Sequence, residues 1–169
     1  FLEISLETAR FAEGGSETPF VGYLRALFAG RPPDLLVPFG APAMNFLRRH
    51  RDTLFPRVPL LVGAVDGRRL KDVKRGANAT AVGVSLDLPA IVENILQILP
   101  STTNIEVVIG NSSLERFWLA ELRRDFKPFA NRVRFNWLNE LSFEETRKRI
   151  AKLSRDTAVL YAVLLVDAA

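Results

Sequence analysis

The chain has 169 residues, of which 48% are hydrophobic and 25% charged, a composition typical of globular domains and unlike that of disordered chains. The formal charge is +4, and the basic residues are spread over several segments, whereas a nucleic-acid binder is expected to concentrate them with aromatics on one surface. Cysteine is absent, which excludes disulfides, thiolate zinc sites and a cysteine nucleophile, and which suits the cytosol or a bacterial periplasm.

The N-terminal part of the chain predicts one strand and one helix. The chain begins at Phe1 without a methionine, which indicates that the natural start, with any signal peptide or membrane anchor, has been removed. Apolar and polar residues alternate at the start of the stretch from Phe1 to Phe11, a pattern that predicts a strand. Thr18 is placed to cap a helix that begins at Pro19.

The stretch from Pro32 to Pro42 predicts a buried parallel strand followed directly by a helix. Prolines and Asp34 end the preceding helix, a short apolar run follows from 35 to 39, and Gly40, Ala41 and Pro42 open the next helix. Free backbone N–H groups gather at such a helix start, where the helix dipole favours an anionic or polar group. We therefore predict ligand contact there, while a glycine needed only for turn geometry is the alternative.

The next strand, from 59 to 65, ends in a second candidate position. Val65 and Asp66 close this strand and should border the same crevice. Asp66 could accept a hydrogen bond from a ligand amine or hydroxyl. The alternative is an Asp-Gly turn in which the carboxylate caps its own backbone.

The rest of the chain repeats the alternation of strand and helix. A strand is predicted at 79–84, followed by a helix capped by Asp87 that ends at Pro100. We place a lobe boundary there, giving an N-terminal lobe of residues 1–100 and a C-terminal lobe of residues 101–169. The second lobe offers strands at 105–109, 133–137 and 157–166, with a capping box at Ser142 and Glu145. The class is therefore α/β with parallel sheets, in two lobes that we expect to face each other across a cleft.

The second lobe contributes further candidate ligand contacts. Asn111, Ser112 and Ser113 follow a strand at the matching place, with plain capping of the helix at Leu114 as the alternative. Trp137 and Tyr161 would stack on a planar ligand if they line the cleft, although core packing is the more common role of strand aromatics.

No catalytic or metal site is predicted. His50 is the only histidine, and it lies among arginines without the partners that a triad or a zinc site needs. Neither a Gly-x-Gly-x-x-Gly motif nor a Walker A lysine loop is present, so the sequence gives no support for a nucleotide cofactor. We expect no cofactor, and we expect that this stretch is not an enzyme.

Several segments resemble one family, the ABC-transporter substrate-binding-like proteins, which have a periplasmic-binding-protein-like fold. Residues 33–43 resemble the segment PDLI-x-x-G-x-P-A, residues 58–66 resemble IPVVF-x-x-V-x-D, and residues 78–84 resemble N-x-T-G-V. Residues 99–110 resemble the start of the second lobe, and the helix end at 49–56 is similar to that in sensor domains of bacterial membrane histidine kinases.

The resemblance implies two Rossmann- or flavodoxin-like lobes of the type I periplasmic-binding-protein kind. It implies an extracytoplasmic, periplasmic portion of an inner-membrane protein that binds a small molecule and signals to an attached kinase module, as a monomer or a homodimer. Apart from the resemblance, Trp137 and Tyr161 suggest an aromatic acid as the ligand, with a small carboxylate as a further candidate, and the spread of the basic residues predicts that no nucleic acid binds. The alternatives are the substrate-binding component of an ABC transporter, or an α/β enzyme of flavodoxin-like or glycosyltransferase type.

Two features depart from the family pattern. Gly67 follows Asp66, where transport-type members usually have proline. The chain also ends before the segment that crosses back to the first lobe in such folds, which predicts a second lobe truncated at its C-terminus.

Overall fold

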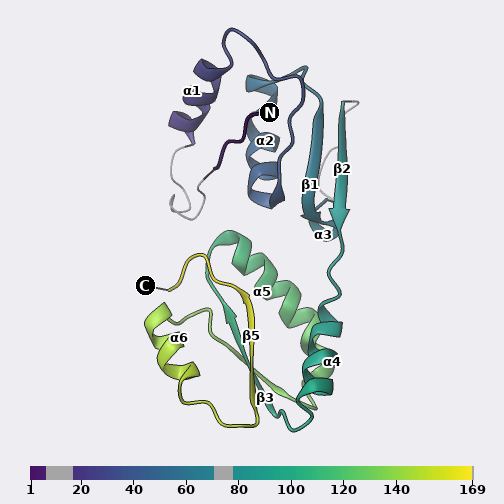
Figure 1. The fold of residues 1–169 in the computed structure, drawn as a ribbon, viewed down its shortest axis with the longest axis vertical. Coiled ribbons are helices and arrows are strands. Elements are labelled where there is room, and N and C mark those ends of the chain that lie inside the picture. Colours follow the sequence, from purple (N-terminus) through teal and green to yellow (C-terminus); the bar gives the residue numbers. More distant parts are fainter. Residues whose placement is uncertain (7–16, 71–77, 169) are drawn as a thin grey trace. The chain divides into compact units, whose positions relative to one another are not determined.

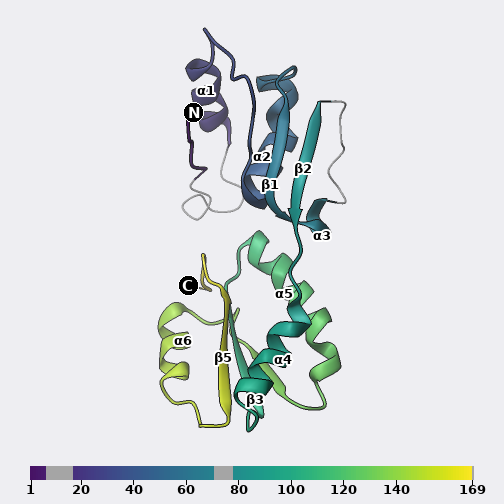
Figure 2. The ribbon, with the colours of Figure 1, turned by 45° about the vertical axis from the view of Figure 1, so that its right-hand side comes forward.

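The computed structural model describes residues 1–6, 17–70 and 78–168 and divides the chain into two compact units, Phe1–Leu86 and Asp87–Ala169 (Figures 1 and 2). The elements of the first unit are α1 (Thr18–Leu27), α2 (Gly40–Leu54), β1 (Leu60–Asp66), α3 (Gly67–Leu70) and β2 (Ala79–Val84). Those of the second unit are α4 (Leu88–Ile98), β3 (Asn104–Ile109), α5 (Ser113–Phe126), the 3₁₀ helix η1 (Lys127–Phe129), β4 (Arg134–Trp137), α6 (Phe143–Ile150) and β5 (Thr157–Val163). Among the described residues, no helix is long and apolar enough to cross a membrane.

The sheet of the first unit consists of β1 and β2 in parallel, with the segment 36–39 running beside β1. Leu36 and Phe39 form isolated parallel bridges to β1, and the Gly63 N–H donates to the carbonyl of Pro38 at 3.0 Å. Pro38 has no N–H to donate to a β1 carbonyl, so the pairing does not extend into a regular strand. The prediction of a buried strand here is therefore wrong in its burial, because Leu35, Val37 and Phe39 are exposed while Pro38 is buried.

A bulge at Ala64 changes the direction of side chains near the end of β1. The pairing with β2 shifts between Gly63 and Val65, which leaves Ala64 as an extra residue with φ of 52°. Because of this extra residue, Val62 and Val65 both enter the core with Met44 instead of facing opposite sides of the sheet. The bulge thus sets the orientation of Asp66, the last residue of the strand.

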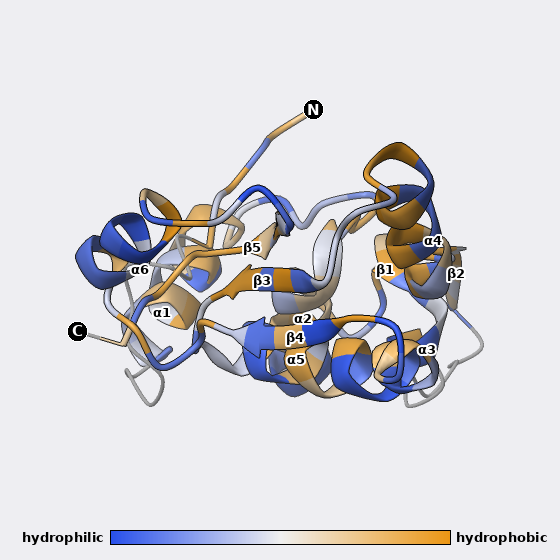
Figure 3. Ribbon diagram, turned by 90° about the horizontal axis from the view of Figure 1, so that it is seen from below, coloured by the Kyte–Doolittle hydropathy of each residue, from blue (hydrophilic) through white to orange (hydrophobic). Residues whose placement is uncertain are grey.

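The second unit has a three-stranded parallel sheet in the order β4-β3-β5. The central strand β3 is almost wholly buried, with α4 and α5 on one face of the sheet and α6 on the other (Figures 1 and 2). Figure 3 shows that α4 is mainly hydrophobic and α6 mainly hydrophilic. The large core accordingly lies on the α4–α5 face, where Leu88, Val92, Ile105, Val107 and Phe126 pack together.

The alternation of strand and helix and the parallel pairing confirm the predicted α/β class. The unit boundary falls between Leu86 and Asp87, earlier than the predicted boundary after residue 100, because α4 packs its apolar face onto β3 and α5. Asp87 caps α4 as predicted, its side chain accepting a hydrogen bond from the Ala90 N–H at 3.2 Å.

The ends of the chain differ from prediction in detail. Residues 1–6 form no strand, and the rest of the predicted strand lies outside the described residues. Helix α1 begins at Thr18, so Glu17 and not Thr18 occupies the cap position. The last strand ends at Val163, short of the predicted 166.

Candidate functional site

The first candidate position is the start of α2. Gly40 has φ of +82°, a conformation that glycine adopts without strain, so the predicted requirement of backbone geometry is confirmed. Phe39, the residue at the cap position, gives no side-chain hydrogen bond to the helix, and no acidic residue lies in the first turn. Ala41 is buried and Pro42 is partly buried. The start of α2 therefore presents the positive end of its dipole without an acidic side chain to neutralise it.

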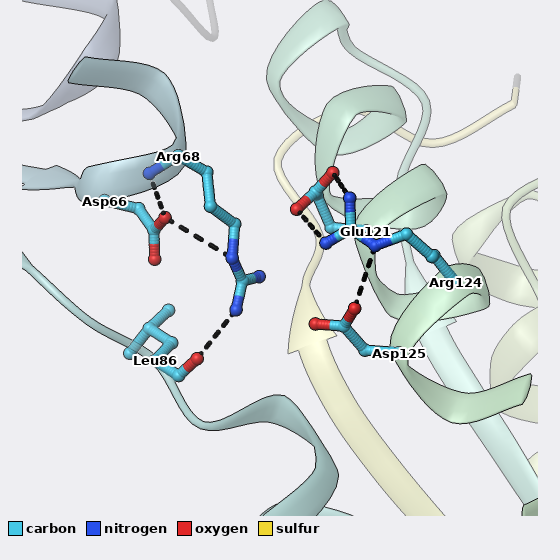
Figure 4. A network of polar contacts seen from close by, with 6 residues as sticks. All are labelled: Asp66, Arg68, Leu86, Glu121, Arg124 and Asp125. Atoms are coloured by element: carbon cyan, nitrogen blue, oxygen red, sulfur yellow. Dashed lines mark hydrogen bonds and ion pairs between the residues drawn. The ribbon is translucent and has the colours of Figure 1, made fainter. Parts of the chain in front are cut away.

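Asp66 is the second candidate position, and it is the most informative residue of the first unit. Its side chain is only 3% exposed. Oδ1 accepts a hydrogen bond from the Arg68 N–H at 2.9 Å and lies 3.7 Å from Nε of the same arginine, whose Nη2 donates to the Leu86 carbonyl at 2.8 Å (Figure 4). Oδ2 is buried and has no hydrogen-bond partner in the described part of the chain.

The structure brings these two positions to the same end of one sheet. Residues 36–39 run parallel to β1, with Phe39 opposite Gly63, so α2 begins where β1 approaches its end at Asp66. This placement agrees with the predicted proximity of the α2 start and Asp66, and the shared crevice stays a prediction. Val65 is only 1% exposed and its side chain packs in the core. Ligand contact by Val65 stays a prediction.

The Asp-Gly turn that was weighed as the alternative for Asp66 is partly present. One carboxylate oxygen does cap the following backbone, at Arg68. The other oxygen is left over, and a turn of this kind does not explain its burial without a partner. Oδ2 of Asp66 is therefore an acceptor without a described partner at the end of β1. The sequence alone could not distinguish it from Oδ1, which caps the backbone.

In the second unit, Asn111, Ser112 and Ser113 follow β3 and open α5. Ser112 is the cap residue of a capping box, in which its side chain accepts from the Glu115 N–H and the Glu115 carboxylate accepts from the Ser112 N–H at 2.8 Å. The structure thus bears out the capping alternative for this loop. Ligand contact by the three residues stays a prediction.

Glu115, which sequence analysis did not single out, connects this loop to the segment after β5. Its side chain is fully buried, and its second oxygen accepts a hydrogen bond from the Leu165 N–H. Gly110 lies so close that an added Cβ would be 2.2 Å from Oε1 of Glu115. The serine and glutamate three residues apart give a capping-box signal in the sequence, but the long-range bond to Leu165 has no such signal.

The structure does not bring Trp137 and Tyr161 together. Trp137 pairs in register with Val107 on the face that α5 covers, whereas Tyr161 pairs with Val108, the next residue along β3, and so lies on the opposite face. The Trp137 ring stacks on Phe135 at 6.1 Å between centroids, and the Tyr161 side chain is 64% exposed. The two rings therefore cannot stack on the same ligand ring.

His50 takes part in an ion-pair cluster with Glu17. Its Nε2 lies 2.5 Å from Oε2 of Glu17, and Arg49 also pairs with this carboxylate. The hydrogen bond from Arg49, with a smaller contribution from His50, holds the pKa of Glu17 below its ordinary value. The cluster ties the start of α1 to α2. Over residues 1–6, 17–70 and 78–168, no group of three or more potential metal-ligating side chains is found.

Comparison with known proteins adds one solved structure. No protein-family model matches the sequence, and no curated protein matches it. The structure matches the ABC domain from Streptococcus pneumonia solved in complex with L-Trp, with a TM-score of 0.59 and 19% sequence identity. The match covers 89% of this chain and 52% of the other, so the chain spans about half the length of the protein it matches.

At this level of identity the match concerns the fold. It covers residues of both units, each of which has a parallel sheet. The chain has a mixed α/β fold of the Rossmann- or flavodoxin-like, periplasmic-binding-protein-like kind.

Proposed function

We propose that the chain binds a small molecule bearing an amino group, with Asp66 as its principal contact in the first unit. The observation that carries the proposal is the buried, unpartnered Oδ2 of Asp66 at the carboxyl end of β1. Buried polar atoms in folded proteins nearly always have a partner, and one left without a partner costs on the order of 1–3 kcal/mol. A ligand ammonium would supply the missing donor to Oδ2, the oxygen opposite to the one that pairs with Arg68.

The start of α2 supports a ligand that carries an acidic group as well. Its backbone N–H groups and dipole favour an anion, and it begins beside β1 at the end of the sheet that holds Asp66. A molecule with an ammonium and a carboxylate, such as an amino acid, carries one group suited to each position. The solved structure of similar fold holds L-Trp, a molecule with both groups, which supports this chemical class.

Binding rather than catalysis is the function that we propose. The described groups around Asp66 are an arginine and backbone atoms, and they do not provide the acid and base that general acid–base chemistry uses. An enzyme of flavodoxin-like or glycosyltransferase type remains the rival from another class.

For the wider context, we propose an extracytoplasmic sensor domain attached to a membrane histidine kinase. Ligand binding would shift a conformational equilibrium that the kinase module reads. This proposal rests on the sequence resemblance alone, and the substrate-binding component of an ABC transporter is an equal alternative. The gene sequence beyond residue 169 distinguishes them, since a membrane-spanning helix and a kinase domain would follow only in the sensor.

A thermal-shift screen of the 169-residue chain tests the proposed chemistry. The panel would pair each L-amino acid with analogues that lack the amino or the carboxylate group. A ligand that binds only the folded chain stabilises it by about 2.7 kcal/mol at a hundredfold excess over its dissociation constant. We expect a saturable rise in Tm for at least one amino acid and none for its des-amino analogue. An equal rise with the des-amino analogue would overturn the assignment of Asp66.

A further inference from the structure

The outer edge of β4 is an unpaired strand edge in the second unit. The strand is outermost in the order β4-β3-β5, and among the described residues its pairing partner is β3 alone. The N–H groups of Arg134 and Leu138 donate to carbonyls in and beside β3, at Thr103 and Val107. Because alternate residues of a strand face the same neighbour, the backbone N–H and C=O groups of Phe135 and Trp137 point away from β3. They are therefore available to another strand.

A groove of about 390 Å³ lies beside this edge, between β4 and the C-terminal end of α5 with η1. Its base is a row of stacked rings, in which Phe126 lies 5.1 Å from Phe135 and Phe135 lies 6.1 Å from Trp137. Such rings offer a flat apolar surface for side chains or for the backbone of a docked segment.

The groove is also basic. Arg123, Lys127 and Arg134 line it, no acidic residue does, and the Arg123 guanidinium lies 5.2 Å from the centre of the Trp137 ring. Within the described part of the chain, these three side chains form no ion pair with a carboxylate. Arg124, next to Arg123 on α5, differs because Glu121 and Asp125 neutralise it (Figure 4). The positive charge beside β4 is thus uncompensated, which favours an acidic partner.

We propose that an extended acidic segment of a partner protein adds to the sheet at β4. Its backbone hydrogen-bonds to Phe135 and Trp137, and its alternate carboxylates, on the α5 face, contact Arg123 and Lys127. Arg134, on the other face of β4, adds positive charge beside the same edge. An extended segment suits the site better than a small molecule, because small-molecule sites bury most of the ligand while all three cations here are exposed. The groove lies at the end of α5 opposite to Ser112, and α5 has 14 residues, about 21 Å of helix. It is therefore separate from the loop predicted to bind the small molecule.

The test uses a fluorescein-labelled octapeptide of alternating Glu and Val, titrated against the 169-residue chain by fluorescence anisotropy. The groove variant carries Arg123→Glu, Lys127→Glu and Arg134→Glu. The matched control carries the same change of charge on exposed positions elsewhere in the second unit, at Lys148, Lys152 and Arg155. Circular dichroism checks the fold of each variant, and Lys127→Glu alone replaces the triple variant if that variant does not fold.

We expect saturable binding that weakens at least about tenfold in the groove variant and less than about threefold in the control, since only the groove variant replaces attraction to the peptide carboxylates by repulsion. Backbone amide signals of Phe135 and Trp137 should shift in two-dimensional NMR spectra, and a peptide N-methylated at alternate residues should bind at least about tenfold more weakly. No saturable binding, or equal losses in the two triple variants, would overturn the proposal. Undiminished binding of the N-methylated peptide would overturn strand pairing in favour of a general anion site, and tighter binding of oligothymidine would overturn a protein partner.

Discussion

Glu115 is predicted to hold the second unit together through its two carboxylate oxygens. The side chain is fully buried. It accepts one hydrogen bond from the N–H of Ser112 and one from the N–H of Leu165, which lies 50 residues after Glu115 in the chain. Replacement by alanine removes both acceptors and leaves two part-buried donors without a partner. A donor left unsatisfied in this way costs about 1–3 kcal/mol, so Glu115→Ala, which leaves two, should lower the free energy of unfolding by about 2–6 kcal/mol.

Glu145 provides a matched control in the same chain. It occupies the same third helical position in the capping box of α6, where it accepts from the Ser142 N–H at 2.9 Å, but it is exposed. Loss of an exposed cap of this kind should cost much less than loss of a buried acceptor, because water can satisfy the freed N–H. The two glutamates thus share a local motif and differ in burial and in the bond to Leu165.

Urea unfolding followed by tryptophan fluorescence measures this difference. The chain has two tryptophans, Trp118 and Trp137, and both lie in the second unit, so the signal reports on that unit. We expect the midpoint of Glu115→Ala to fall well below that of Glu145→Ala, with similar slopes. If the two variants unfold within about 0.5 kcal/mol of each other, the inference that Glu115 connects the loop to the segment after β5 is refuted.

Three further predictions concern the same fold. Gly110→Ala should destabilise the second unit by about 1–3 kcal/mol, since the new Cβ would be 2.2 Å from Glu115 Oε1 and 2.3 Å from the Val166 carbonyl. Gly22→Ala, with open space around it, should not destabilise α1; urea unfolding followed by circular dichroism, which reports on both units, checks the two variants, and equal effects would contradict the reasoning. Arg149→Ala should cost about 2 kcal/mol, because it leaves the buried carboxylate of Glu106 with Asn136 as its remaining partner, and Glu106→Gln in the same chain should restore part of the loss. Glu17→Gln should make Tm fall less steeply as the pH is lowered. The pKa of Glu17 is lowered in the folded chain, so its carboxylate stabilises the fold above about pH 4.5, and this contribution is lost as the pH falls through the folded-state pKa. An unchanged pH dependence of Tm between pH 5 and pH 2 would contradict this reasoning.

Local sequence signals predicted the starts of α4, α5 and α6 and the class of the fold, but not the start of α1. The Ser-x-x-Glu spacing at Ser142, the cap at Asp87 and the alternation of apolar strands with amphipathic helices each depend on neighbours within a few residues. Such signals survive in any tertiary context that keeps the helix. The predicted α/β class was correct for this reason.

Features that depend on distant contacts could not be read from the sequence. The apolar run at 35–39 looks like a buried strand, but Pro38 interrupts its pairing and leaves Phe39 exposed. Gly63 is a weak local signal of the bulge, but the residue with positive φ is Ala64. The Asp66 oxygen without a partner becomes visible only once Arg68 has been placed. The boundary after residue 100 was too late because the apolar face of α4 carries no sign of which core it joins.

Isothermal titration of one amino acid into variants of Asp66 tests the central claim most directly. The amino acid would be the one that gives the largest rise in Tm, and the variants would be Asp66→Asn and the exposed control Asp34→Asn. Asparagine keeps an acceptor for the Arg68 N–H but removes the charge that would bind an ammonium group. The account predicts a loss of roughly 10- to 100-fold in affinity for Asp66→Asn, the size expected of a hydrogen bond to a charged group, and none for Asp34→Asn. Unchanged affinity in Asp66→Asn, with the fold intact by circular dichroism, would contradict it.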